Sequence, residues 1–166
     1  ARRTAPDTAH VWNFGFGANI NPHKLQTTRR ITPVEVVLGE LNGWQLRFNH
    51  RGGFGNIVPA AGSPTAPSLS PTVPQPASVH GVLLKFSLDD FARLAGMEHQ
   101  YDAREVVVQT YDGRTVSALS FISPHRFATV RHDLLPTQRY IKLIATGARQ
   151  MRLKSSYCEW LEQVPC

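Results

Sequence analysis

Residues 11–19 have the sequence VWNFGFGAN, a short apolar run that passes into two closely spaced glycines. Such a run predicts a strand that ends in a tight loop. Asn21-Pro22 follows at once, and Asn at an N-cap with Pro at the first helical position predicts the start of a helix. This helix is expected to end around Arg29 and Arg30, whose charges suit the negative end of a helix.

Two tight turns further along the chain are flanked by strand-like segments. One turn contains Asn42-Gly43 and the other contains Asp112-Gly113. Because Asn-Gly and Asp-Gly favour the turns of β-hairpins, each turn is predicted to join two antiparallel strands. The predicted strands are residues 34–41, 44–48, 104–111 and 115–122.

Residues 79–86 are predicted to form a strand that leads directly into a helix. Ser87-Leu88-Asp89-Asp90 has the form of a capping box, with Asp in place of Glu or Gln. Gly96 is expected to end this helix, which places Glu98 in the turn behind it. A short strand is also predicted at residues 56–58, and further helices are predicted from Pro136 to about Gly147 and after Ser155 or Ser156.

The length and the order of these elements bound the fold class. The chain has 166 residues, of which 42% are hydrophobic, and this is enough for the core of one domain. Strands and helices do not alternate regularly, which argues against a doubly wound parallel sheet. We expect an α+β fold with a mixed, strongly curved β-sheet or small barrel of about six strands and about four surrounding helices.

A polar N-terminal segment and a proline-rich internal segment define the expected domain organisation. Residues 1–10 are interpreted as an N-terminal tail, either a remnant of a processed targeting segment or a linker, and residues 11–166 as a single domain. Residues 59–79 hold six prolines and four serines and are predicted to form a long flexible surface loop. A proline-rich ligand for a partner domain is the less favoured interpretation of this segment.

Composition argues against several classes of function. No apolar run approaches 18 residues, so a transmembrane helix is not expected. The net charge is +6, but the basic residues are scattered, which favours a solvated basic face or a small carboxylate site over nucleic-acid binding. The two cysteines suit a reducing compartment, so a cytoplasmic location is expected, and the seven histidines show no metal-ligand spacing.

Several motifs follow one another in a fixed order. They are Phe16-Gly17-Ala18-Asn19, Leu25 with Arg29, Gly55 to Val58, Val79 to Val82, Leu94 to Glu98, Tyr101 to Arg104 with Val106, Tyr140 to Ala148, and Tyr157 with Leu161. Their order resembles that of the gamma-glutamylcyclotransferase family, with its gamma-glutamylcyclotransferase-like or AIG2-like fold, over about residues 12–163. Three positions depart from the family pattern: Phe16 replaces a tyrosine, Ala18 a serine, and His99 a glycine.

The resemblance implies a barrel-like α+β enzyme that cleaves gamma-glutamyl amides without a cofactor. In that reaction the α-amine of the gamma-glutamyl unit attacks its own γ-carbonyl, which releases 5-oxoproline and an amino acid or amine. The implied partner is a small gamma-glutamyl substrate, with no nucleic acid and no membrane. The oligomeric state is left open, with a homodimer as one alternative.

The resemblance also assigns roles to particular residues. Glu98 is the candidate general acid and base, since ring closure needs a proton acceptor at the amine and a donor at the leaving nitrogen. Backbone N–H groups of Gly17 and Ala18 are candidates to stabilise the oxyanion or to hold the substrate carboxylate. Asn19 and Tyr140 are candidate substrate ligands, and Phe16 occupies the position of a substrate-binding tyrosine.

Each of these residues also has a structural interpretation. Glu98 is then a surface turn residue, the glycines form a tight turn, Asn19 caps the following helix and Tyr140 belongs to the core. A further alternative is a catalytically altered relative that binds a small ligand or partner protein without turnover, which the changes at Phe16 and Ala18 favour. Net charge alone supports a third alternative, a module that binds nucleic acid or an acidic partner.

Overall fold

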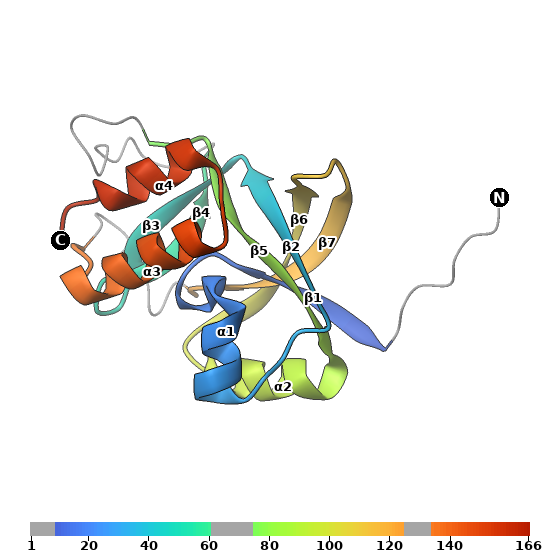
Figure 1. The fold of residues 1–166 in the computed structure, drawn as a ribbon. Helices are drawn as coiled ribbons and strands as arrows, with labels where there is room; N and C mark the ends of the chain where they lie inside the picture. The colour runs from blue at the N-terminus through green and yellow to red at the C-terminus, as the bar shows by residue number, and fades with distance from the viewer. Residues whose placement is uncertain (1–8, 61–74, 125–133) are drawn as a thin grey trace.

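The computed structural model describes residues 9–60, 75–124 and 134–166, and Figure 1 shows their arrangement. The strands are β1 (His10–Gly15), β2 (Glu35–Asn42), β3 (Trp44–His50), β4 (Phe54–Pro59), β5 (Ser78–Ser87), β6 (Asp102–Thr110) and β7 (Thr115–Ile122). The helices are η1 (Ala18–Ile20), α1 (Pro22–Lys24) with its continuation η2 (Leu25–Arg29), α2 (Leu88–Met97), α3 (Gln138–Gln150) and α4 (Ser155–Glu162).

Five strands close into a barrel in the order β1-β5-β2-β6-β7. Strand β5 pairs antiparallel with β1 on one side and with β2 on the other, and β1 closes the barrel by pairing parallel with β7 at Asn13 and Leu119. Strands β3 and β4 form a separate two-stranded antiparallel sheet. The expected α+β class with a small, strongly curved sheet is therefore confirmed.

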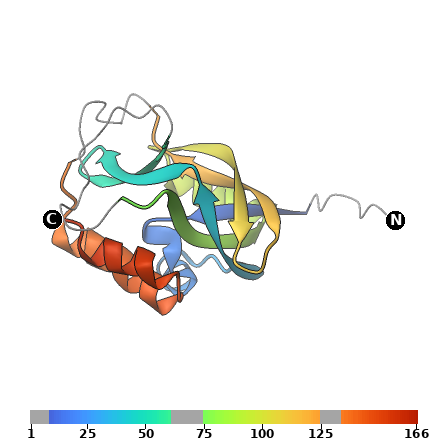
Figure 2. The ribbon, with the colours of Figure 1, turned by 90° about the horizontal axis from the view of Figure 1, so that it is seen from above.

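Strand β5 is the most continuously apolar strand because both of its faces are buried in the core. Val82, Leu83, Leu84 and Phe86 are all fully buried, although successive side chains of a strand point to opposite faces. One face of β5 therefore looks into the barrel and the other is covered by other elements. Helices α3 and α4 lie side by side on one side of the molecule, whereas α1 and α2 lie at the lower end in Figure 1. Figure 2 shows the same arrangement from above.

The prediction of a β-hairpin at Asn42-Gly43 is wrong. Strands β2 and β3 follow each other across Gly43 but pair in different sheets, because both edges of β2 are taken by β5 and β6. Gly43 has a φ of +78°, and it bonds to the chain on either side of the 60–77 segment: its N–H donates to Ala77 and its carbonyl accepts from Ala60. The second predicted hairpin is confirmed, with Gln109 opposite Thr115 and Gly113 at positive φ.

The helix starts are predicted better than the helix ends. The Asn21 side chain accepts a hydrogen bond from the N–H of His23, and the Ser87 side chain accepts one from Asp90, as expected for N-caps. Helix α2 continues through Gly96 to Met97. Helix α3 continues past Gly147, where the missing side chain allows Ile20 to pack against the helix rather than ending it.

Some expectations fall on residues that the structure does not describe. These are most of the N-terminal tail and residues 61–74 of the proline-rich segment. Strand β4 ends at Pro59 and β5 begins at Ser78, and the predicted loop between them stays a prediction. In the described ranges, no helix has the length and apolar character needed to cross a membrane.

The barrel requires a glycine at position 81. A Cβ there would collide with the carbonyl oxygen of Gly15 and lie 2.9 Å from the Phe14 ring, so the main chain would have to shift. Overpacking of this kind costs about 1–3 kcal/mol, and Gly81→Ala should lower the free energy of unfolding by that amount in denaturant titrations.

The matched control is Gly96→Ala in α2, where a Cβ meets no atom within 4 Å. It should stabilise the protein by about 0.5–1 kcal/mol, and equal effects at the two positions would contradict this account.

Candidate functional site

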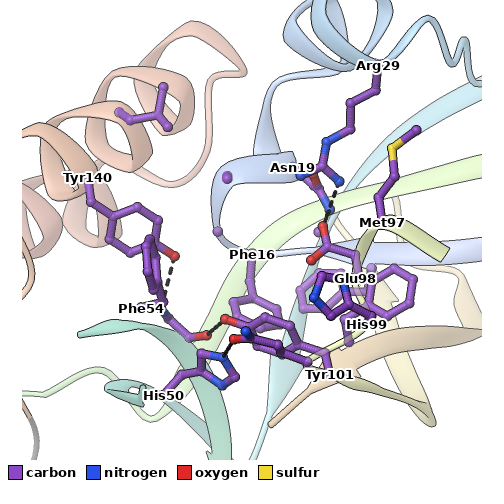
Figure 3. A pocket seen from close by; sticks show the side chains of 18 residues that line it. Phe16, Asn19, Arg29, His50, Phe54, Met97, Glu98, His99, Tyr101 and Tyr140 are labelled. Carbon is purple, nitrogen blue, oxygen red and sulfur yellow. Dashed lines mark hydrogen bonds and ion pairs between the residues drawn. The ribbon is translucent and has the colours of Figure 1, made fainter. Parts of the chain in front are cut away.

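A cavity of about 390 Å³ opens between the barrel, the β3–β4 sheet and helix α3. Its walls come from the loop after β1, the end of α2 with the turn that follows, the start of β4, and α3 (Figure 3). The lining residues are Phe14, Gly15, Phe16, Gly17, Ala18, Asn19, Arg29, His50, Phe54, Gly55, Met97, Glu98, His99, Gln100, Tyr101, Phe121, Tyr140 and Leu143.

Glu98 is held at one end of this cavity by two side chains. It is the C-cap residue of α2, and its own N–H bonds back to Leu94 and Ala95. Its Oε1 atom accepts a hydrogen bond from Arg29 at 2.7 Å and another from Asn19 at 3.3 Å. The side chain is only 16% exposed. In the described ranges no hydrogen bond or ion pair reaches Oε2, so this oxygen is left for a ligand.

In the loop between β1 and α1, two glycines lie so close to other groups that a side chain at either position would have little room. A Cβ at Gly15 would lie 3.0 Å from the carbonyl oxygen of Asn19, and one at Gly17 would lie 3.2 Å from the Tyr140 hydroxyl. The N–H of Ile20 bonds to the carbonyl of Gly17, which turns the chain into η1. This turn brings Asn19 to Glu98 and places Gly17 and Ala18 in the cavity wall.

Two tyrosines hold the main chain of Gly55 on the opposite side. The Tyr140 hydroxyl accepts a hydrogen bond from the Gly55 N–H at 3.0 Å, and the Tyr101 hydroxyl donates to the Gly55 carbonyl at 3.1 Å. Burial, with the Glu98 carboxylate nearby, raises the pKa of Tyr140 to about 12. The pKa of Tyr101 is also raised, mainly by burial, so both phenols are neutral at pH 7.

His50 packs against the ring of Tyr101. The two rings stack with centroids 4.1 Å apart, and the His50 ring nitrogens lie 2.7 Å from the Ser123 hydroxyl and 3.3 Å from Gln100 Oε1. Burial lowers the pKa of His50, although the hydrogen bond to Gln100 and the charge of Glu98 act in the opposite direction. Because the ordinary value of about 6.5 is already below neutrality, this ring is uncharged at pH 7.

The structure brings all the sequence-predicted site residues into this one cavity. Phe16, Gly17, Ala18, Asn19, Glu98 and Tyr140 all line it, and the roles assigned to them stay predictions. Asn19 does not cap the helix that follows, because Asn21 fills that position and Asn19 bonds to Glu98.

Residues to which the sequence gave no individual role in the site also line the cavity, among them Arg29, His50, Phe54 and Gly55, the last three in the 50–56 segment that we expected to border the leaving side of the pocket. The sequence assigned Arg29 to the end of a helix, whereas its side chain reaches Glu98 across the fold. The available signal for Arg29 as a site residue was its place in the order of motifs, directly after the motif that contains Asn19. No local pattern predicts the contact of His50 with Tyr101, because the pairing of β3 with β4 in the second sheet places His50 against that ring.

No metal centre is evident in the part of the chain that the structure describes, where no group of three or more His, Cys, Asp or Glu side chains gathers. The cavity polar groups are instead one carboxylate, one guanidinium, amides, phenols and histidines. Such a set can bind a small polar molecule and move protons.

Solved structures with the same architecture include proteins described as gamma-glutamyl cyclotransferases. One such structure has a TM-score of 0.71 and 19% identity, covering 93% of this chain and 88% of that chain. An uncharacterized protein from Homo sapiens has a TM-score of 0.74 and 19% identity, covering 94% and 88%. A gamma-glutamyl cyclotransferase from yeast, described as specific to glutathione, has a TM-score of 0.64 and 14% identity, covering 95% and 96%.

These likenesses define the class of fold, a barrel shared with solved cyclotransferases. The family follows from the sequence itself, because residues 78–161 match the AIG2-like family. The chain therefore belongs to the AIG2-like family. No curated protein matches the sequence.

The hydrogen bond between Tyr140 and Gly55 gives a stability prediction. Tyr140→Phe keeps the ring but leaves the Gly55 N–H, which lies in a buried residue, without its acceptor. An unsatisfied buried donor costs about 1–3 kcal/mol, so the free energy of unfolding should fall by that amount in denaturant titrations. Circular dichroism should confirm an unchanged fold, and an unchanged unfolding midpoint would show that another acceptor replaces the phenol.

Proposed function

We propose that this protein cleaves gamma-glutamyl amides by intramolecular cyclisation and releases 5-oxoproline. The observation that carries the proposal is the Glu98 carboxylate at the polar end of the cavity, with one oxygen bound by Arg29 and Asn19 and the other facing no partner in the described residues. Membership of the AIG2-like family and the fold shared with gamma-glutamyl cyclotransferases support the same reaction.

The proposed chemistry needs only positioning and proton transfer. The α-amine nitrogen of the gamma-glutamyl unit forms a bond to the γ-carbonyl carbon, and the bond from that carbon to the leaving nitrogen breaks. Holding the two ends of one molecule together can supply effective molarities of about 10⁵–10⁸ M. Glu98 accepts a proton from the attacking nitrogen and returns it to the leaving nitrogen, so its charge is restored after each cycle.

The surroundings of Glu98 suit this role. Arg29 and Asn19 fix the direction of the carboxylate through Oε1, which leaves Oε2 to exchange the proton. The loop at Gly17 and Ala18 lies in the same wall, and its backbone N–H groups are the candidates to stabilise the negative charge on the γ-carbonyl oxygen. Backbone donors do not depend on the side chain, so alanine at position 18 is compatible with this role.

The test is Glu98→Gln. Glutamine keeps an oxygen that can accept from Arg29 and Asn19, but it cannot take up the proton. Because general acid–base catalysis typically contributes about 10²–10⁴-fold, single-turnover release of 5-oxoproline should fall by at least about 100-fold with little change in substrate affinity. Thermal melting checks that the variant is folded.

The matched control is Glu105→Gln, which removes an exposed carboxylate of β6 that bonds to Ser117 and does not line the cavity. This variant should keep the activity of the unmodified protein. A folded Glu98→Gln protein that retained more than about a tenth of the activity would rule out Glu98 as the acid–base group. Thermal stabilisation by gamma-glutamyl compounds with no turnover would instead support a ligand-binding relative, the alternative that Phe16 and Ala18 favour.

A further inference from the structure

The cavity has two chemically different ends. In Figure 3, Glu98, Asn19 and Arg29 lie at one end, Tyr140 and Phe54 lie at the other, and Phe16 lies between them. A gamma-glutamyl amide that places its reacting atoms at Glu98 must direct its leaving amine away from that residue. The chemistry of the far end therefore bears on which amine is released.

The far end is aromatic. The Phe54 and Tyr140 rings meet edge to face with centroids 5.1 Å apart, and the Tyr140 ring meets Phe48 in the same way. Phe54 is 49% exposed although it lines the cavity, and among the described aromatic residues only Tyr111 is comparably exposed. A phenylalanine exposed at a cavity wall offers a face that an apolar group can cover, and such edge-to-face or stacked contacts add to the gain from burial.

The far end also lacks a fixed positive charge in the described ranges. Arg29 is the only arginine or lysine among the described lining residues, and it is bound to Glu98. Tyr140 and Tyr101 are neutral phenols there, and burial keeps His50 neutral at pH 7. A carboxylate packed against these rings would lose water without gaining a counter-ion from the described lining residues, which is unfavourable.

From this arrangement we infer, on the basis of the proposed function, that the leaving group of the substrate has an apolar, aromatic body without a carboxylate, and that Phe54 is the specificity-determining residue that contacts it. The preferred class is thus a gamma-glutamyl arylalkylamine rather than a gamma-glutamyl peptide that ends in a carboxylate. A volume of about 390 Å³ lies within the range typical of small-molecule sites.

Three synthetic substrates separate the effects of the ring and of the charge. They are gamma-glutamyl-2-phenylethylamine, gamma-glutamyl-ethylamine, which lacks the ring, and gamma-glutamyl-glycine, which adds a carboxylate. Because the loss of apolar groups from a pocket typically costs about 10–200-fold, kcat/KM for 5-oxoproline release should be at least about tenfold higher for the phenylethyl compound than for the ethyl compound. The glycine compound should be the poorest of the three.

Phe54→Ala should remove most of this preference. Its kcat/KM for the phenylethyl compound should fall about tenfold, while the value for the ethyl compound changes less than about twofold. The control variant is Leu88→Ala, which truncates a comparably exposed apolar side chain on α2 that does not line the cavity. It should leave all three values unchanged.

A binding measurement separates this inference from the proposed function. Calorimetric titration of Glu98→Gln with the same three compounds reports the preference without turnover. If no compound yields 5-oxoproline, the proposed function fails, but tighter binding of the phenylethyl compound that depends on Phe54 upholds the assignment of the aromatic end. Equal or stronger turnover or binding of the glycine compound, or no binding of the phenylethyl compound, overturns the inference, and 5-oxoproline release would then still support the proposed function.

Discussion

Barrel closure through β5 is the constraint on which the rest of the structure depends. Residues 82–87 of this strand pair with all of β1, and residues 78–85 pair with β2 on the other edge, so β5 fixes where β1 ends. Gly81 permits the close approach, because a side chain there would meet Gly15 and Phe14. The loop that follows Gly15 is thereby directed into the space that becomes the cavity, and α2, which continues directly from β5, brings Glu98 to the same space.

The cavity is assembled from both ends of the sequence by contacts between distant residues. Arg29 reaches Glu98 from η2, and Tyr140 of α3 reaches Gly55 of β4. Neither contact joins neighbouring elements of the barrel. The polar end is therefore held by an ion pair and a hydrogen bond to Glu98. The aromatic end is held by ring packing together with hydrogen bonds of Tyr140 and Tyr101 with the main chain of Gly55, and the two ends meet at Phe16 and Gly17.

The sequence predicted the elements and the candidate site residues better than the connections between strands. The N-caps at Asn21 and Ser87 and the turn at Gly113 depend on local chemistry, so they were confirmed. The Asn42-Gly43 turn has the same local signal but a different outcome, because pairing of β2 with β5 and β6 leaves no edge for β3. The positions of Glu98 and Tyr140 in the cavity followed from the order of motifs, whereas His50 and Phe54 enter it from a second sheet, β3 and β4, whose pairing the local pattern did not predict.

The binding of Gly55 by Tyr101 and Tyr140 has a consequence for how this site can change in evolution. Both hydrogen bonds use main-chain atoms of Gly55, so the backbone of β4 keeps its place whatever side chain stands next to it. A Cβ at position 55 itself would lie 2.9 Å from the Tyr140 hydroxyl, so a side chain there would displace the hydroxyl that binds the Gly55 N–H. Position 54 carries no such restriction, and its side chain is half exposed. Single substitutions at position 54 can therefore change the lining of the cavity while the contacts of Gly55 and the end that holds Glu98, Arg29 and Asn19 stay as they are.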